Sequence, residues 1–281
     1  MKTYRMPFQY WRDEHYLLLR KTKGRRWADD PEYYMREHLY WTKDGSGPYF
    51  LNRRCRGLMD RLGSFSGKYQ NHDTLCDRHV GETAYVFCPG PTMGKIDHAL
   101  FDDRLTFAVN SAGFRVNSTY WVIAESGYAL WLLKQDFPHD RTFVATGRVA
   151  SILRDFENRK KRDLFGEVFV IRWMEEHVTP ARTPAVSTTE ALVTAWQMGC
   201  KKAVVFGLDL SKKGGAYVKG VPHTSFGAKN PFDDQIKALK QFELPDFEVL
   251  NCSPLSQPNL PNFTSVSYEE IAESLRSENA A

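Results

Sequence analysis

The chain has 281 residues, a length that fits one large α/β domain with an appendage or two unequal domains. With 42% apolar and 26% charged residues it is neither a disordered nor a collagen-like sequence, and no apolar run approaches the roughly 20 residues that cross a bilayer. We therefore expect a cytoplasmic protein without a membrane span that buries a sizeable core.

The net charge of +4 is unevenly distributed along the chain. Residues 1–80 hold 16 Lys and Arg against 10 Asp and Glu, and they contain 14 of the 38 aromatic residues. Such a segment can bind nucleic acid by charge and stacking, or it can pack its aromatic rings on the main domain with its charges in water. We expect an N-terminal extension of helices and loops over 1–80, with loops at 42–74.

The five cysteines have irregular spacing. An odd number without a regular pattern does not indicate a disulfide framework. Cys76 and His79 could contribute to a zinc site, but no paired Cys-x-x-Cys motif accompanies them. We therefore expect reduced cysteines and no metal centre.

From residue 82 onward, short apolar runs alternate with helical segments. The expected strands are 84–88, 106–110, 120–124, 142–146, 167–171, 203–207 and 247–251. The expected helices are 94–101, 127–136, 148–159, 188–199 and 230–242. Strands with little alternation, separated by helices, are typical of a parallel sheet covered on both faces. We predict a Rossmann-like, doubly wound α/β fold over residues 81–281, with ligands at the carboxyl ends of its strands.

The first two expected strands end in residues suited to a nucleotide. Gly90, Pro91 and Thr92 form a turn before a helix, where backbone N–H groups and the helix dipole favour phosphate. Asn110 and Ser111 follow the second strand, and an amide there can donate to and accept from a base or a ribose. Both features also have purely structural explanations, a tight turn and an Asx turn.

Polar residues also follow the third and fifth strands. Glu125 places a carboxylate on the same edge of the sheet. Arg182 lies in a Pro-bracketed loop that could close over the site and contact a phosphate. Ser187 and Thr188 open a helix and offer a second anion site, although helix capping explains Ser187 equally well.

The sixth strand leads into the segment richest in reactive side chains. Asp209 follows it directly, at a position where carboxylates bind ribose, hold a metal or act as acid or base. Ser211, Lys212 and Tyr217 belong to the glycine-rich loop that comes next. His223 is a candidate general base near neutral pH, or an ordinary surface histidine.

Three segments together resemble known families: residues 85–92, residues 107–110, and residues 195–211 with Ser187 ahead of them. They are similar to the bacterial sialyltransferases of the Campylobacter type and, equally, to the related group of the archaeal 6-hydroxymethylpterin diphosphokinase. The resemblance covers about residues 82–275 and leaves out the basic N-terminal 80.

The sialyltransferase resemblance implies roles for individual residues. Gly90-Pro91-Thr92, Asn110 and Ser187 match positions that hold the cytidine nucleotide of the donor. Tyr217 matches one of two tyrosines that steady the departing phosphate without a metal, whereas Ser211 stands where the other tyrosine would be. His223 approximates the histidine base of the family.

These inferences give a set of predicted site residues. The predicted nucleotide-binding residues are Gly90, Pro91, Thr92, Asn110, Ser111, Glu125, Ser187, Thr188 and Ser211. The predicted phosphate-binding residues are Arg182 and Lys212, and the predicted catalytic residues are His223, Tyr217 and Asp209.

The leading hypothesis is a transferase with a nucleotide-activated, CMP-sugar-like donor and no cofactor. Two helix N-termini would bind the leaving phosphate, while Tyr217, Lys212 and Arg182 offset its charge. His223 would take the proton from the acceptor hydroxyl.

Two alternatives stay open. A pterin diphosphokinase would bind ATP at the same edge and need Mg²⁺, with Asp209 and Glu125 as the available carboxylates. A phage-type protein that binds or modifies nucleic acid would hold it through residues 1–80 and act in the host cytoplasm. The sequence leaves open whether the protein assembles into a homo-oligomer.

Overall fold

The computed structural model describes residues 39–41, 48–50, 68–138, 140–171, 187–210, 217–222, 232–240, 242–253 and 260–280. The chain divides into two compact units, Met1–Ser66 with Trp173–Arg182 and Gly67–Arg172 with Thr183–Ala281. In the first unit, β1 (Leu39–Trp41) and β2 (Pro48–Phe50) form an antiparallel pair. The sequence does not predict these strands. Most of the basic and aromatic segment lies outside the described residues.

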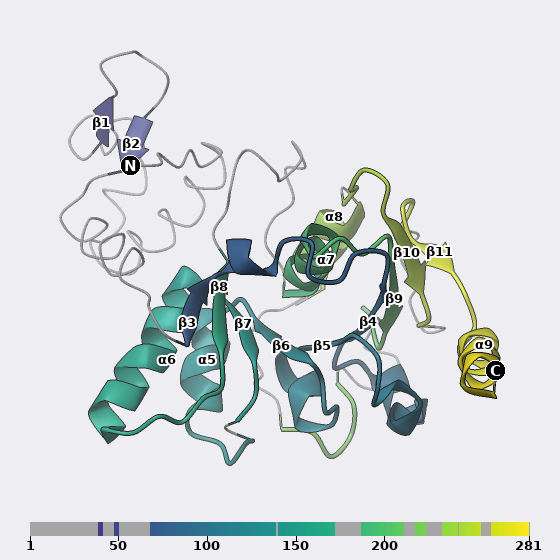
Figure 1. Cartoon of the computed structure of the whole chain (residues 1–281), viewed down its shortest axis with the longest axis horizontal. Helices are drawn as coiled ribbons and strands as arrows, with labels where there is room; N and C mark the ends of the chain where they lie inside the picture. Colours follow the sequence, from purple (N-terminus) through teal and green to yellow (C-terminus); the bar gives the residue numbers. More distant parts are fainter. Residues whose placement is uncertain are drawn as a thin grey trace. The chain divides into compact units, whose positions relative to one another are not determined.

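The second unit is built on a sheet of nine parallel strands in the order β11-β10-β9-β4-β5-β6-β7-β8-β3 (Figure 1). The strands are β3 (Tyr69–Asn71), β4 (Thr83–Phe87), β5 (Thr106–Val109), β6 (Tyr120–Ile123), β7 (Phe143–Thr146), β8 (Val168–Ile171), β9 (Lys202–Phe206), β10 (Glu248–Asn251) and β11 (Thr264–Ser265). All seven predicted strands are confirmed, each within one residue of its expected bounds. The edge strands β3 and β11 were not predicted, and β2 and β3 lie in the segment expected to be loops.

The helices of this unit are α5 (Ser126–Leu132), α6 (Gly147–Lys160), α7 (Ser187–Gln197), α8 (Asp233–Lys240) and α9 (Tyr268–Ala280). The first four confirm predicted helices, whereas α9 was not predicted. The prediction of a helix over 94–101 is wrong, because two 3₁₀ helices, η2 (Pro91–Lys95) and η3 (His98–Phe101), take its place. Asp97 separates them, since its carboxylate accepts a hydrogen bond from Ala99 N at 3.3 Å and begins a new turn.

Alternate residues of the strands pack into two apolar layers, one on each face of the sheet. One layer joins Val86, Phe107 and Val205 with buried residues of α7 and α8. The opposite layer is aromatic: Phe87 stacks on Phe206 with ring centroids 5.1 Å apart, and both rings contact Phe101 of η3. Helices α5 and α6 lie side by side near β7 and β8 (Figure 1). Burial of both faces explains why the central strands are apolar along their whole length.

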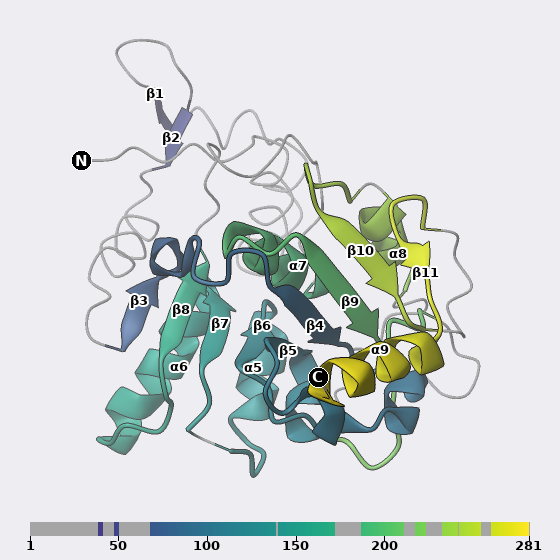
Figure 2. The ribbon, with the colours of Figure 1, turned by 45° about the vertical axis from the view of Figure 1, so that its right-hand side comes forward.

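The chain changes once the side of β4 on which it adds strands, and this switch matters for ligand binding. From β4 the chain adds β5, β6, β7 and β8 outward on one side. It then returns through α7 to β9, which pairs with the other edge of β4, and continues to β10 and β11 (Figure 2). In doubly wound sheets the crevice for a ligand opens at such a switch point, beyond the carboxyl ends of the two strands. The site is therefore expected after β4 and β9.

Candidate functional site

The loops that follow β4 and β9 touch at the switch point. Gly90 N donates to the Gly207 carbonyl at 3.0 Å, and Cys88 N donates to the Phe206 carbonyl at 2.8 Å. A Cβ atom on Gly90 would lie 2.2 Å from Gly207 O and 2.5 Å from Asp209 Oδ2. Gly207 has a φ of +67°, and a Cβ there would lie 2.1 Å from Cys88 O. Glycine is required at both positions because no side-chain atom fits between the two loops.

Asp209 joins the same two loops through its carboxylate. Thr92 N donates to Oδ2 at 2.8 Å, and the Thr92 hydroxyl donates to Oδ1 at 2.7 Å. Asp209 is only 2% exposed and Thr92 only 3%. The structure thus brings together Gly90, Thr92 and Asp209, and it gives the Asp209 carboxylate two partners within the protein.

A second junction links the end of β5 to the start of α7. The Asn110 amide donates to Ser187 Oγ at 3.2 Å, and the Asn110 backbone carbonyl accepts from Trp121 Nε1 at 2.6 Å. Asn110 has a φ of +48°, a conformation that asparagine tolerates better than most residues. Next to Ser187, Thr188 Oγ1 lies 3.4 Å from Cys88 Sγ at the end of β4. The first turn of α7 is therefore fixed against the carboxyl ends of both β4 and β5.

A third group of polar side chains gathers beyond β5 and β6. It consists of Ser111 in the 3₁₀ helix η4 (Asn110–Phe114), Glu125 after β6 and Tyr128 in α5, together with Tyr217 of the loop after β9, which interacts electrostatically with Glu125 and Tyr128. We call these four residues the hydroxyl cluster. Tyr128 was not predicted, because a tyrosine inside an apolar helix has the pattern of a core residue.

Burial shapes the ionisation of this hydroxyl cluster. Loss of water raises the pKa of Tyr128, the nearby Ser111 side chain lowers it by a smaller amount, and the neighbouring Tyr217 raises it further. Burial also raises the pKa of Tyr217, and the nearby Glu125 carboxylate raises it further. Glu125 is an exposed residue, yet the protein around its carboxyl removes enough water to raise the pKa of that group. Near neutral pH both phenols are therefore protonated and can donate hydrogen bonds.

Four predicted site residues, Arg182, Ser211, Lys212 and His223, lie outside the described residues. Pro91 opens η2 beside Thr92. Most of the other predicted residues follow the ends of four adjacent strands, β9, β4, β5 and β6, whereas Ser187 and Thr188 open α7 and Tyr217 lies further along the loop after β9. Within the described part of the chain, no group of three or more His, Cys, Asp or Glu residues is placed to hold a metal ion. No helix in that part is long and apolar enough to cross a membrane.

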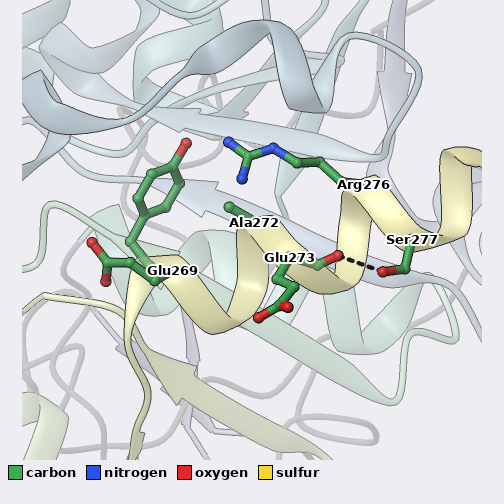
Figure 3. A pocket seen from close by; sticks show the side chains of 6 residues that line it. Glu269, Ala272, Glu273, Arg276 and Ser277 are labelled. Atoms are coloured by element: carbon green, nitrogen blue, oxygen red, sulfur yellow. Dashed lines mark hydrogen bonds between the residues drawn. The ribbon is translucent and has the colours of Figure 1, made fainter.

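A hollow of about 500 Å³ lies elsewhere, along α9 (Figure 3). Tyr268, Glu269, Ala272, Glu273, Arg276 and Ser277 line it. Its floor is the helix itself, in which the Ser277 hydroxyl donates to the Glu273 carbonyl at 2.9 Å (Figure 3). None of the predicted site residues lines this hollow.

Comparisons with known proteins add one finding. No protein-family model matches the chain, and neither does any curated protein. Among solved structures, the chain is similar to the sialyltransferase CstII from Campylobacter jejuni, solved in complex with a substrate analogue, cytidine-5'-monophosphate. The two share 16% identity over 67% of this chain and 86% of that one, with a TM-score of 0.40. Nothing matched corresponds to the pterin diphosphokinase group.

Proposed function

We propose that this protein is a transferase that uses a nucleotide-activated sugar as its donor. The observation that carries the proposal is the convergence of polar groups at the switch point of the sheet. The Thr92–Asp209 and Asn110–Ser187 junctions hold the ends of β4, β5 and β9 and the start of α7 in one place. In doubly wound folds, nucleotides bind at this place, with phosphate near a helix N-terminus.

The reaction can be written with residues of this chain. The leaving phosphate would lie at the start of α7, because the first N–H groups of a helix have no partner within the helix and Ser187 adds a hydroxyl. Arg182 and Lys212 would offset the negative charge that develops on it. His223 would accept the proton of the acceptor hydroxyl as that oxygen attacks the sugar carbon.

The test is a thermal-shift screen of the full-length protein. CMP, UDP and GDP are compared with CMP-N-acetylneuraminate, UDP-glucose and GDP-mannose, because a ligand that binds only the folded protein raises its melting temperature. We expect one base series to protect the protein, and we expect EDTA to leave that protection unchanged. Protection by ATP and a pterin only in the presence of Mg²⁺ would favour the diphosphokinase instead.

Serine-to-alanine variants locate the binding site within this screen. Ser187→Ala removes the hydroxyl that meets Asn110 at the start of α7, and we expect it to weaken nucleotide binding by about two- to tenfold. Ser277→Ala is the matched control, because it removes an exposed serine hydroxyl from α9. Equal affinities of both variants and the wild type would contradict the assignment of the site.

A further inference from the structure

The hydroxyl cluster contains a buried polar atom that no described residue satisfies within hydrogen-bond distance. Tyr128 is only 3% exposed, and its hydroxyl has no hydrogen-bond partner at 3.5 Å or less in the described part of the chain, although the Ser111 side chain lies close enough to lower its pKa. Buried hydroxyl groups in native proteins are nearly always hydrogen-bonded, so an unpaired one calls for an explanation. A ligand that enters this place would supply the missing partner.

The hydroxyl is held in a fixed position by its surroundings. Tyr128 packs against Trp131 with ring centroids 5.3 Å apart, and Trp131 contacts Phe114 of η4 at 6.1 Å. Ala129 and Leu132 of the same helix are fully buried. A phenol fixed in this way loses little conformational entropy when it binds a ligand, which favours binding.

The chemistry around this hydroxyl selects the kind of ligand. Tyr128 lies among the side chains of Ser111 and Tyr217, and Tyr217 in turn lies near the Glu125 carboxylate. A carboxylate repels phosphate and carboxylate groups but accepts hydrogen bonds from hydroxyl groups. Three hydroxyl groups, one carboxylate and adjacent aromatic rings therefore suit an uncharged polyhydroxyl group better than an anion.

We propose that the hydroxyl cluster binds the hydroxyl groups of an uncharged sugar unit and that Tyr128 donates a hydrogen bond to one of them. The proposal rests on the proposed function, since the sugar unit would belong to the nucleotide-activated donor. Two parts of such a donor share this chemistry, the ribose of the nucleotide and the sugar that is transferred.

Tyr128→Phe tests the proposal because it removes only the hydroxyl oxygen. Among the described residues that oxygen has no hydrogen-bond partner, so the variant should melt at the same temperature as the wild type or higher. Affinity for the sugar ligand should fall by about two- to tenfold, as expected for one lost hydrogen bond. A merely structural role of the hydroxyl predicts the opposite pair of results, a lower melting temperature and unchanged affinity.

Tyr69→Phe is the matched control. Tyr69 is equally buried, but its hydroxyl donates to Glu157 Oε2 at 2.6 Å at the far edge of the sheet. This variant should melt at a lower temperature and keep the wild-type affinity. If Tyr128→Phe behaved like Tyr69→Phe, the proposal would be wrong.

The ligands in the thermal-shift screen distinguish the two sources of the sugar unit. If the ribose binds here, Tyr128→Phe should weaken binding of the nucleotide and its sugar conjugate alike, and the 2'-deoxynucleotide should bind wild type and variant equally. If the transferred sugar binds here, only the conjugate should lose affinity. Equal affinities of wild type and variant for every ligand that binds would overturn the proposal.

A separate arm applies if no nucleotide protects the wild-type protein, because that result defeats the proposed function. Glucose and N-acetylglucosamine then test the cluster alone. Protection of the wild type that Tyr128→Phe loses would support a sugar site, and no protection would overturn it.

Discussion

Asp209 and Thr92 show how a single side-chain contact fixes the geometry of the switch point. Both carboxylate oxygens accept hydrogen bonds from Thr92, one from its backbone and one from its hydroxyl. Gly90 lies against the same carboxylate, so that any larger residue would displace it. The contact therefore holds the loop after β4 in the position where a nucleotide would meet its backbone.

Replacing the Asp209 carboxylate should lower the free energy of unfolding, and the loss should depend on whether the new side chain can still bond to Thr92. Asp209→Ala leaves the buried Thr92 N–H and hydroxyl without acceptors, so we expect the free energy of unfolding to fall by about 2–3 kcal/mol. Asp209→Asn can accept from the N–H and donate to the hydroxyl oxygen, so it should cost only about 1 kcal/mol. Urea unfolding followed by tryptophan fluorescence measures both.

Thr92→Ser serves as the control, because it keeps both donors and should change stability little. An Asp209→Ala protein with the unfolding midpoint of the wild type would show that the contact does not stabilise the two loops.

Residues at strand ends could be predicted from the sequence, whereas Tyr128 could not. Asn110, Ser187 and Asp209 stand next to apolar strands or open a helix, and parallel strands bring such residues to one edge of the sheet. Tyr128 lies within a helix among apolar neighbours, where tyrosine usually belongs to the core. Only the three-dimensional position of its hydroxyl shows whether such a tyrosine is a core residue or a residue of the candidate site.

At the scale of elements, long-range contacts decide what the sequence leaves undetermined. The strand β3 has only three residues, Tyr69–Asn71, and no apolar alternation. It forms because it pairs in parallel with β8 and because Lys68 and Tyr69 both bond to Glu157 in α6. Local propensity carries no information about such partners, which lie almost 90 residues away in the chain.

Because β3 is held through the Glu157 carboxylate, the stability that this contact provides depends on pH. Burial alone would raise the pKa of its carboxyl, but hydrogen bonds from Lys68, Tyr69 and the backbone of Leu164 and Phe165 lower it below its ordinary value of 4.5. A carboxyl with a lowered pKa in the folded state stabilises the protein above its unfolded pKa, and the stabilisation is lost as the pH falls through the folded value.

Glu157→Gln should reveal this stabilisation. We expect the variant to lose about 1–3 kcal/mol near pH 7, because the charge-assisted bonds to Lys68 and Tyr69 are weakened. The loss should shrink as the pH falls from 4.5, where the carboxyl of the unfolded chain gains a proton, through the lower pKa of the folded state. Chemical unfolding over a pH series measures the difference.

Glu167→Gln is the control at the same edge of the sheet. Glu167 also bonds to β3, accepting from Gln70 Nε2 at 2.7 Å, but that contact is exposed. A loss of equal size in both variants, or one independent of pH, would contradict the role of Glu157.

At the scale of the whole molecule, the sheet was predictable and its outer limits were not. Seven strands buried on both faces give strong apolar runs, and their alternation with helices predicts a parallel sheet. The N-terminal limit depends instead on residues 67–80. They are polar, with two basic and two acidic residues and no apolar run, yet they belong to the compact unit that contains the sheet.

Two truncated chains test where that unit begins. A chain of residues 67–281 keeps β3, Lys68 and Tyr69, whereas a chain of residues 81–281 loses all three and also Leu75, which is fully buried. The shorter chain exposes the edge of β8, leaves the buried Glu157 without Lys68 and Tyr69, and opens a cavity at Leu75. Deleting one buried leucine typically costs about 2–5 kcal/mol, so 81–281 should be less stable than 67–281 by at least about 3 kcal/mol. The midpoints of urea unfolding of the two chains measure this difference in stability, with the full-length protein as reference. If both truncated chains unfold at the same midpoint, β3 and the residues around it do not belong to the core of this unit.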